Sequence, residues 1–414
     1  MLSTRSAAAL YVGAVLGPGV LLLPALAAEA AGPASVLAWV GLLAISAPLA
    51  VTFAALGVRY PEAGGTAAYA RAAFGWRAGT VTGWWFLAGV IIGGPSVALI
   101  GGFYVAELLD AGREGAVAGA AGMMAAVVAM NAVGLKATAR LQLGLAGLLA
   151  ALLLVAIVTA LPETQGENWT PFAPHGWAAI GTAASLLMLS FIGWEAVSHL
   201  AGELRDPARQ LPRAIFAALG VVVVLYLGLA VATVGVLGTS APSDVPLADL
   251  MAAGLGAPGR TVTAALAVLL TMGAMNAYFA AATKLAGALA PNSALARPGR
   301  ALALIGMVGG ALLVPLGIEL LSLEGLVRAT SASFVAVYVL ATAAGIRLLT
   351  GAARASAAVA FVAVTLVLGF SGPYVVVPAV LAAAALLATL RGASPSLRTP
   401  GASCRTFSPA WRAR

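Results

Sequence analysis

Long apolar runs, separated by short polar or Gly/Pro-rich breaks, fill most of this sequence. Each run approaches the roughly 20 apolar residues that a helix needs to cross the hydrocarbon core of a bilayer. No long polar low-complexity segment interrupts them. The pattern predicts about a dozen spanning helices, at 7–30, 34–58, 78–108, 116–134, 139–161, 178–203, 212–237, 260–289, 300–317, 325–349, 354–370 and 373–390.

Composition places these helices in a membrane. Charged residues make up 9% of the 414 residues, whereas they make up about a quarter of an ordinary soluble domain. Hydrophobic residues make up 62%, and the mean hydropathy is +1.02. A soluble protein of this length could not bury so much apolar surface, so we predict an all-α integral membrane protein. The single cysteine, Cys404, excludes a disulfide within the chain and a cysteine-based metal site, and no cofactor is expected.

Basic residues are distributed unevenly over the two sides of the predicted bundle. If the N-terminus is cytoplasmic, all but three of the 22 basic residues (Arg113, Arg260 and Arg328) fall on the inner side. Most acidic residues fall in outer loops. The positive-inside rule requires this asymmetry, so we expect an even number of spans and two cytoplasmic termini. The net charge of +8 is then a topological signal, and no nucleic acid partner is expected.

Two predicted helices are interrupted at corresponding places. The first contains Gly17-Pro18-Gly19, where proline lacks an N–H and the glycines weaken the helix, so we expect a break at 16–20. For this span alone, a simple proline kink is the alternative. The sixth span places Gly193 and the carboxylate of Glu195 near mid-membrane. Paired interrupted helices of this kind are typical of inverted-repeat transporters with a site at the midplane.

The two breaks predict an amphoteric binding site. Free N–H groups at half-helix N-termini attract a carboxylate, and exposed carbonyls at the opposite ends attract an ammonium. An α-amino acid carries both groups. We therefore expect the substrate to contact Gly17, Pro18, Gly19, Ser190, Phe191, Ile192 and Gly193. Phe191 and Ile192 would make the side-chain pocket apolar, which favours methionine, leucine, isoleucine and valine, although core packing selects the same residue types.

Several motifs of this chain form a familiar set. They are Leu16-Gly17-Pro18-Gly19-Val20, Arg59-Tyr60-Pro61-Glu62-Ala63-Gly64-Gly65-Thr66, Glu203-Leu204-Arg205-Asp206-Pro207 and Leu211-Pro212-Arg213-Ala214. With these motifs the chain resembles the amino acid–polyamine–organocation (APC) superfamily over about residues 8–350. The chain also contains Val81-Thr82-Gly83-Trp84 and Gly193-Trp194-Glu195-Ala196. In these it most resembles, within that superfamily, the bacterial YjeH-type exporters of methionine and branched-chain amino acids.

This resemblance implies a LeuT-like fold and proton-coupled export of amino acids across a bacterial inner membrane. We expect a first inverted repeat at 1–161, a second at 162–350, two further helices at 351–391 and a basic cytoplasmic tail at 392–414 near anionic lipid. The chain departs from many relatives at Pro18, whose backbone cannot donate to a carboxylate. It also departs at Leu189, where some antiporters carry a gating tryptophan.

Two residues of the sixth span are candidates for proton coupling. Glu195 lies within the predicted span, where a carboxylate is expensive and usually faces a cavity or a partner. It would load and release the proton, or it would only brace the unwound segment. His199, one turn further on, would relay protons or simply pack.

Residues on two other helices have open roles. Phe334 and Tyr338, four residues apart in the tenth helix, would form an outer gate or pack in the core. Asn276 and Thr271 in the eighth helix would bond the broken first helix or make an ordinary interhelical hydrogen bond.

Other functions remain as alternatives. Uptake or exchange by the same kind of transporter is possible, because the sequence does not fix the direction of transport. A membrane enzyme would need an acidic metal cluster or a catalytic His/Cys set, and the chain has two histidines and one cysteine. A channel would need a pore filter, which is not apparent. The oligomeric state is not predicted.

Overall fold

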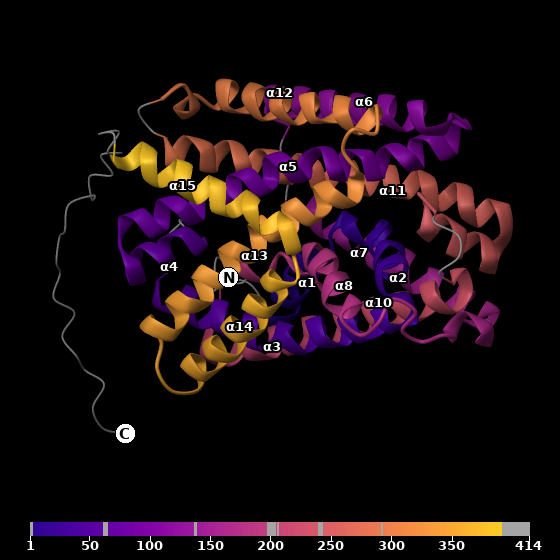
Figure 1. Ribbon diagram of the computed structural model, residues 1–414, viewed down its shortest axis with the longest axis horizontal. Helices are drawn as coiled ribbons and strands as arrows, with labels where there is room; N and C mark the ends of the chain where they lie inside the picture. Colours follow the sequence, from indigo (N-terminus) through magenta and orange to yellow (C-terminus); the bar gives the residue numbers. More distant parts are fainter. Residues whose placement is uncertain are drawn as a thin grey trace.

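The computed structural model describes residues 3–60, 65–135, 139–196, 204, 207–238, 243–290 and 293–390. These residues form α-helices joined by short 3₁₀ and π turns. The long helices lie side by side along the longest axis of the molecule (Figure 1). Within the described residues, nine helical segments are long and apolar enough to cross a membrane, and three shorter apolar helices accompany them.

The helices follow the predicted spans closely. They are α1 (Thr4–Val15), α2 (Leu23–Ala31), α3 (Ser35–Arg59), α4 (Gly65–Phe74), α5 (Trp76–Leu109), α6 (Gly112–Ala132), α7 (Ala139–Ala160), α8 (Ala179–Leu187), α10 (Pro207–Ala232), α11 (Pro246–Leu289), α12 (Pro298–Gly317), α13 (Leu323–Leu348), α14 (Gly351–Gly369) and α15 (Val376–Leu390).

Three elements differ from the prediction. Helix α4 was not predicted, because its mixed polar sequence is too short to resemble a span. Helix α11 begins at Pro246 rather than at 260 and bends at Gly256, where φ is +70°. The sixth span, predicted to run to 203, ends as an α-helix at Leu187. Residues 197–203 lie outside the described part of the chain.

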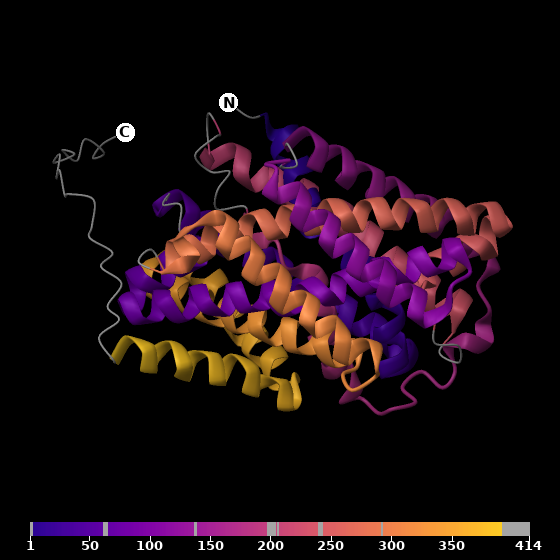
Figure 2. The ribbon, with the colours of Figure 1, turned by 90° about the horizontal axis from the view of Figure 1, so that it is seen from above.

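Helix α5 forms the centre of the bundle. It contacts α4, α6, α11 and α13, and Trp85 Nε1 ties it to α15 by donating to the carbonyl of Pro378 (2.7 Å). Helices α6 and α12 lie along one edge (Figure 1), and the view from above shows α15 at the opposite side from α7 (Figure 2). The helices at the edge carry large apolar side chains that would face lipid, among them Met307, Val314, Val359 and Leu366.

Long-range ion pairs gather at one end of the bundle. Arg260 of α11 pairs with Glu107 of α5 and with Asp249, and Arg113 Nε lies 3.1 Å from Glu319 Oε1. We call this end the acidic face and the opposite end, where α1 and α7 begin, the basic face. Five of the residues that the charge pattern assigned to the outer side therefore form ion pairs with one another.

A cavity of about 400 Å³ opens at the acidic face. Leu22, Phe103 and other apolar side chains line it, and Glu29, Asp244 and Arg113 add charge. Burial raises the pKa of the Asp244 carboxyl, and the nearby Arg113 opposes that shift. The cavity lies at the acidic-face end of the first broken helix.

Candidate functional site

The first break separates α1 from α2. Gly17 has the extended backbone (φ −100°, ψ 170°) that a residue before proline prefers. Pro18 then starts a single 3₁₀ turn to Leu21, and α2 begins at Leu23. The break predicted at 16–20 is therefore confirmed, and it is an unwound segment rather than a simple kink. It frees backbone groups in the middle of the bundle.

The second break follows α8. A 3₁₀ turn, Met188–Phe191, leads to the extended Ile192 and then to Gly193 at φ +136°. A Cβ at Gly193 would lie 2.1 Å from the carbonyl oxygen of Ala14. Glycine is therefore required at position 193 for two reasons: the backbone has a positive φ, and α1 approaches it closely. The two breaks are in direct contact at this point.

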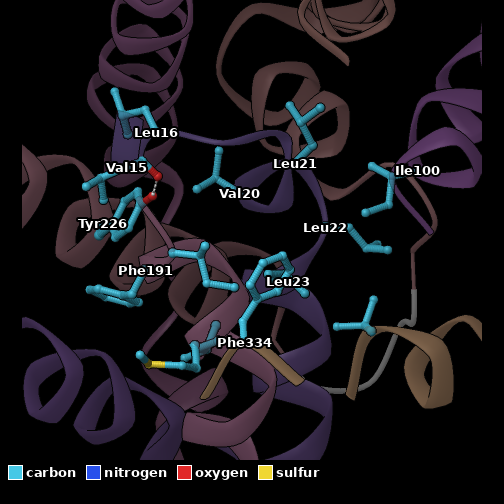
Figure 3. Packing of buried hydrophobic residues seen from close by; sticks show 14 of the residues in the cluster. Val15, Leu16, Val20, Leu21, Leu22, Leu23, Ile100, Phe191, Tyr226 and Phe334 are labelled. Atoms are coloured by element: carbon cyan, nitrogen blue, oxygen red, sulfur yellow. Dashed lines mark hydrogen bonds between the residues drawn. The ribbon is translucent and has the colours of Figure 1, made fainter. Parts of the chain in front are cut away.

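One tyrosine joins the two breaks. The Tyr226 hydroxyl, on α10, lies 2.9 Å from the carbonyl oxygen of Val15 and 2.9 Å from that of Ser190. Figure 3 shows it directed at the end of α1. Tyr104 of α5 likewise donates to the carbonyl oxygen of Leu21 (2.8 Å). Buried hydroxyls thus satisfy carbonyls that unwinding would leave without a donor.

Replacing Tyr226 with phenylalanine is expected to destabilise the protein by about 1–3 kcal/mol, the cost of leaving a buried carbonyl without its donor. The melting temperature in detergent measures this loss. Tyr374→Phe, which removes a hydroxyl near the acidic face and keeps the ring over Arg328, is the matched control. Equal melting temperatures for the two variants would contradict the bridging role.

A small central pocket of about 50 Å³ lies between the breaks. Backbone of the first break and three glycines of α5 form much of its wall, and Phe334, Phe279 and Ile192 add apolar surface. The lining residues are Gly17, Pro18, Gly19, Gly89, Val90, Gly93, Gly94, Val97, Leu189, Ile192, Met275, Tyr278, Phe279, Thr330 and Phe334. None of them carries a charge.

A larger cavity of about 480 Å³ lies between the central pocket and the basic face. Residues of α1, α7 and α11 line it, and so do Gly193 and Glu195 of the second break. Glu195 is the charged residue among those lining residues. A carboxylate therefore stands where this cavity meets the break.

The Glu195 carboxylate is held by two donors. The backbone N–H of Gly193 donates to Glu195 Oε2 (2.9 Å), and the Tyr338 hydroxyl donates to the same oxygen. Tyr338, on α13, also lies 3.1 Å from the Gly193 nitrogen. Glu195 is half-buried, and Tyr338 is fully buried. This arrangement fixes one oxygen of the carboxylate beside the large cavity.

The predicted site residues line both cavities. Gly19 and Ile192 line the central pocket alone, Gly193 and Glu195 line the larger cavity alone, and Gly17 and Pro18 line both. Phe191 lines neither of these two cavities. The centroid of its ring lies 5.7 Å from that of Trp39 and 5.2 Å from that of Tyr226, which Figure 3 shows beside it.

Ser190 is buried against Gly19, and its hydroxyl has no hydrogen-bond partner among the described residues. Its carbonyl is the one that Tyr226 reaches. His199 lies outside the described residues.

The two residues of α13 lie at different places. Phe334 lines the central pocket and makes an edge contact with Phe86, with ring centroids 5.2 Å apart. Tyr338, one turn further, bonds Glu195.

Asn276 of α11 makes the ordinary interhelical hydrogen bond that was one of its two predicted roles. Its side-chain oxygen accepts from Asn131 (2.6 Å), and its side-chain nitrogen donates to the carbonyl of Leu135.

Sequence reasoning missed Tyr226 and Tyr104, and also Tyr278, which lines both cavities. Tyr226 and Tyr104 are buried within long apolar runs, and a buried tyrosine hydroxyl usually has a partner. That signal shows that a partner exists, but the partner itself comes from another helix. Among the described residues, no group of three or more His, Cys, Asp or Glu could hold a metal ion.

Comparisons with known proteins agree with this geometry. The model of the family described as "Amino acid permease" matches residues 2–297. The chain is 35% identical to the uncharacterized amino acid permease YecA of Bacillus subtilis (strain 168), over 91% of this chain and 92% of that protein. It is 31% identical to the L-methionine/branched-chain amino acid exporter YjeH of Escherichia coli (strain K12), over 86% and 88%.

A solved structure shares the fold at low sequence identity. The crystal structure of MhsT in complex with L-phenylalanine aligns with a TM-score of 0.62 at 15% identity, over 90% of this chain and 99% of that one.

Proposed function

Because this chain belongs to the amino acid permease family of the APC superfamily and has a LeuT-like fold, we propose that it exports neutral, apolar amino acids in exchange for protons. The family and the fold are those of multi-pass membrane transporters, not enzymes. Amino acids and membrane lipid are accordingly its partners. The proposal concerns the substrate, the direction and the coupling ion.

The lining of the central pocket supports the proposed choice of substrates. Its lining side chains are uncharged, and the only hydroxyls among them belong to Tyr278 and Thr330. A charged substrate side chain would lose its hydration there without gaining a partner. Methionine, leucine, isoleucine and valine would instead bury apolar surface against Ile192, Phe279 and Phe334. The name of the relative YjeH points to the same amino acids.

Backbone groups of the two breaks would hold the amino acid's own charges. Gly17, Pro18 and Gly19 of the first break and Leu189 and Ile192 of the second line the pocket, so their backbone groups are the ones within reach of the substrate. Pro18 has no N–H, so the substrate carboxylate would depend on Gly19 and its neighbours. Ser190 offers a buried hydroxyl without a partner among the described residues.

Glu195 would couple transport to protons. It is the carboxylate beside the cavity that leads from the basic face to the breaks. The carboxylate would take up a proton in one orientation of the transporter and release it in the other, and this would couple proton movement to movement of the amino acid. With the basic face cytoplasmic, as the positive-inside rule predicts, substrate would enter through the large cavity and leave past Phe334 towards the acidic face. His199 would relay protons, and Phe334, at the central pocket, would gate the outer path. Tyr338, predicted as its partner in that gate, bonds Glu195 beside the larger cavity instead.

Efflux from cells loaded with dipeptides tests this function. Cells that express the protein should release methionine and leucine faster than control cells after loading with methionine- and leucine-containing dipeptides, and lysine release should be unchanged. Unchanged release of methionine and leucine by correctly inserted protein would overturn export of these substrates. Faster uptake of either amino acid would support the alternative, an uptake permease of the same fold.

A further inference from the structure

The central pocket and the larger cavity meet at three residues. Gly17, Pro18 and Tyr278 line both. On α11, Met275 and Phe279 face the central pocket, whereas Ala274, Ala277 and Ala281 face the larger cavity. Tyr278 lies between these two faces of the helix. The wall between the cavities is therefore thin and consists of few side chains.

Only one of the three boundary residues has a side chain that can move. Gly17 has no side chain, and a Cβ added there would meet no atom within 4 Å. The ring of Pro18 is fixed to the backbone. Tyr278 has two rotatable side-chain bonds and is half-buried, with small alanines towards the larger cavity. Rotation of this ring would join the two cavities without unwinding any helix.

Tyr278 also lies beside groups of both breaks. It shares the larger cavity with Gly193 and Glu195 of the second break, and it lines both cavities together with Gly17 and Pro18 of the first. No other described residue lines both cavities and carries a mobile side chain.

From this geometry we infer that the side chain of Tyr278 is the inner gate of the substrate pocket. Its ring separates the pocket from the cavity at the basic face, and a change of rotamer opens the passage. This inference rests on the proposed transport function, which it deepens by naming a local gate in addition to movement of whole helices. The ring, not the hydroxyl, does the blocking.

Cysteine labelling tests the gate without measuring transport. The single native thiol is removed by Cys404→Ser, and Val97→Cys places a reporter in the central pocket. Inverted membrane vesicles are treated with a small methanethiosulfonate reagent. If the Tyr278 ring controls access of the reagent to the central pocket, labelling of the reporter should be slow in the protein that keeps Tyr278. The rate should rise about tenfold or more with Tyr278→Ala. With Tyr278→Phe, which keeps the ring, it should stay within about twofold of the parent rate.

Ala281→Cys, in the larger cavity, is the matched control and should react at one rate in all three backgrounds. If Tyr278→Ala does not accumulate, Tyr278→Val removes the ring equally. Unchanged labelling at Val97→Cys, while Ala281→Cys reacts, would overturn the gate. Equal acceleration by Tyr278→Phe would overturn the role of the ring, and an unreactive Ala281→Cys would overturn the assignment of the cavity to this side. All of these rates are independent of which substrate the protein carries.

Discussion

Replacing Gly193 with alanine is expected to abolish transport and to lower the stability of the protein. The new Cβ would lie 2.1 Å from the carbonyl oxygen of Ala14, and the residue would have to keep φ near +136°. Backbone strain of this kind costs about 1–3 kcal/mol, and forced overpacking costs about 1–3 kcal/mol more. Relief requires the two breaks to separate, which displaces the substrate site itself.

Transport of methionine by reconstituted protein and its melting temperature in detergent measure both effects. Gly147→Ala in α7 is the matched control, because a Cβ there would meet no atom of the described residues within 4 Å and alanine favours a helix. Control transport should match the parent protein. Normal transport by the Gly193 variant would show that the contact between the breaks is dispensable.

Replacing Glu195 with glutamine is expected to uncouple transport from protons. Glutamine keeps the shape, and its oxygen can still accept from the Gly193 N–H and the Tyr338 hydroxyl. It cannot release a proton. The ratio of internal to external methionine that a pH gradient sustains should fall about tenfold or more. A tenfold fall in this ratio corresponds to a loss of about 1.4 kcal/mol of driving free energy. Exchange of internal for external methionine should persist, because the backbone of both breaks still binds the substrate.

Both activities are measured in proteoliposomes with labelled methionine. Glu163→Gln, at an exposed carboxylate outside the helical core, should leave both unchanged. Full pH-driven accumulation by the Glu195 variant would assign coupling to another group, and Glu195 would then only brace the unwound segment. Loss of exchange together with accumulation would instead place Glu195 in substrate binding.

The features that sequence reasoning predicted well are those with a local cause. Gly17-Pro18-Gly19 breaks a helix by its own chemistry, whatever packs around it. Long apolar runs locate the spans because the bilayer demands them. Helix α11 shows where such local reasoning fails. The sequence around Gly256 and Pro258 resembles a loop, but it lies within a bent helix.

Features that depend on pairing between distant segments could not be predicted. Gly193 was expected to approach the substrate, and the structure places it against α1, whose carbonyl lies about 180 residues away in the chain. Phe191 was expected in the pocket, yet the aromatic cluster with Trp39 and Tyr226 takes its ring. The apolar pattern is the same for a pocket wall and for a packed core, so only tertiary structure separates them.

Methionine accumulation in proteoliposomes that are acidic inside is the most direct test of the central claim, exchange of a proton for a neutral amino acid. Protons leaving along their gradient should drive labelled methionine inwards above its external concentration, and a protonophore should abolish this accumulation. Lysine should not accumulate. The account would be contradicted if methionine equilibrated without accumulating, or if it accumulated only when the gradient was reversed.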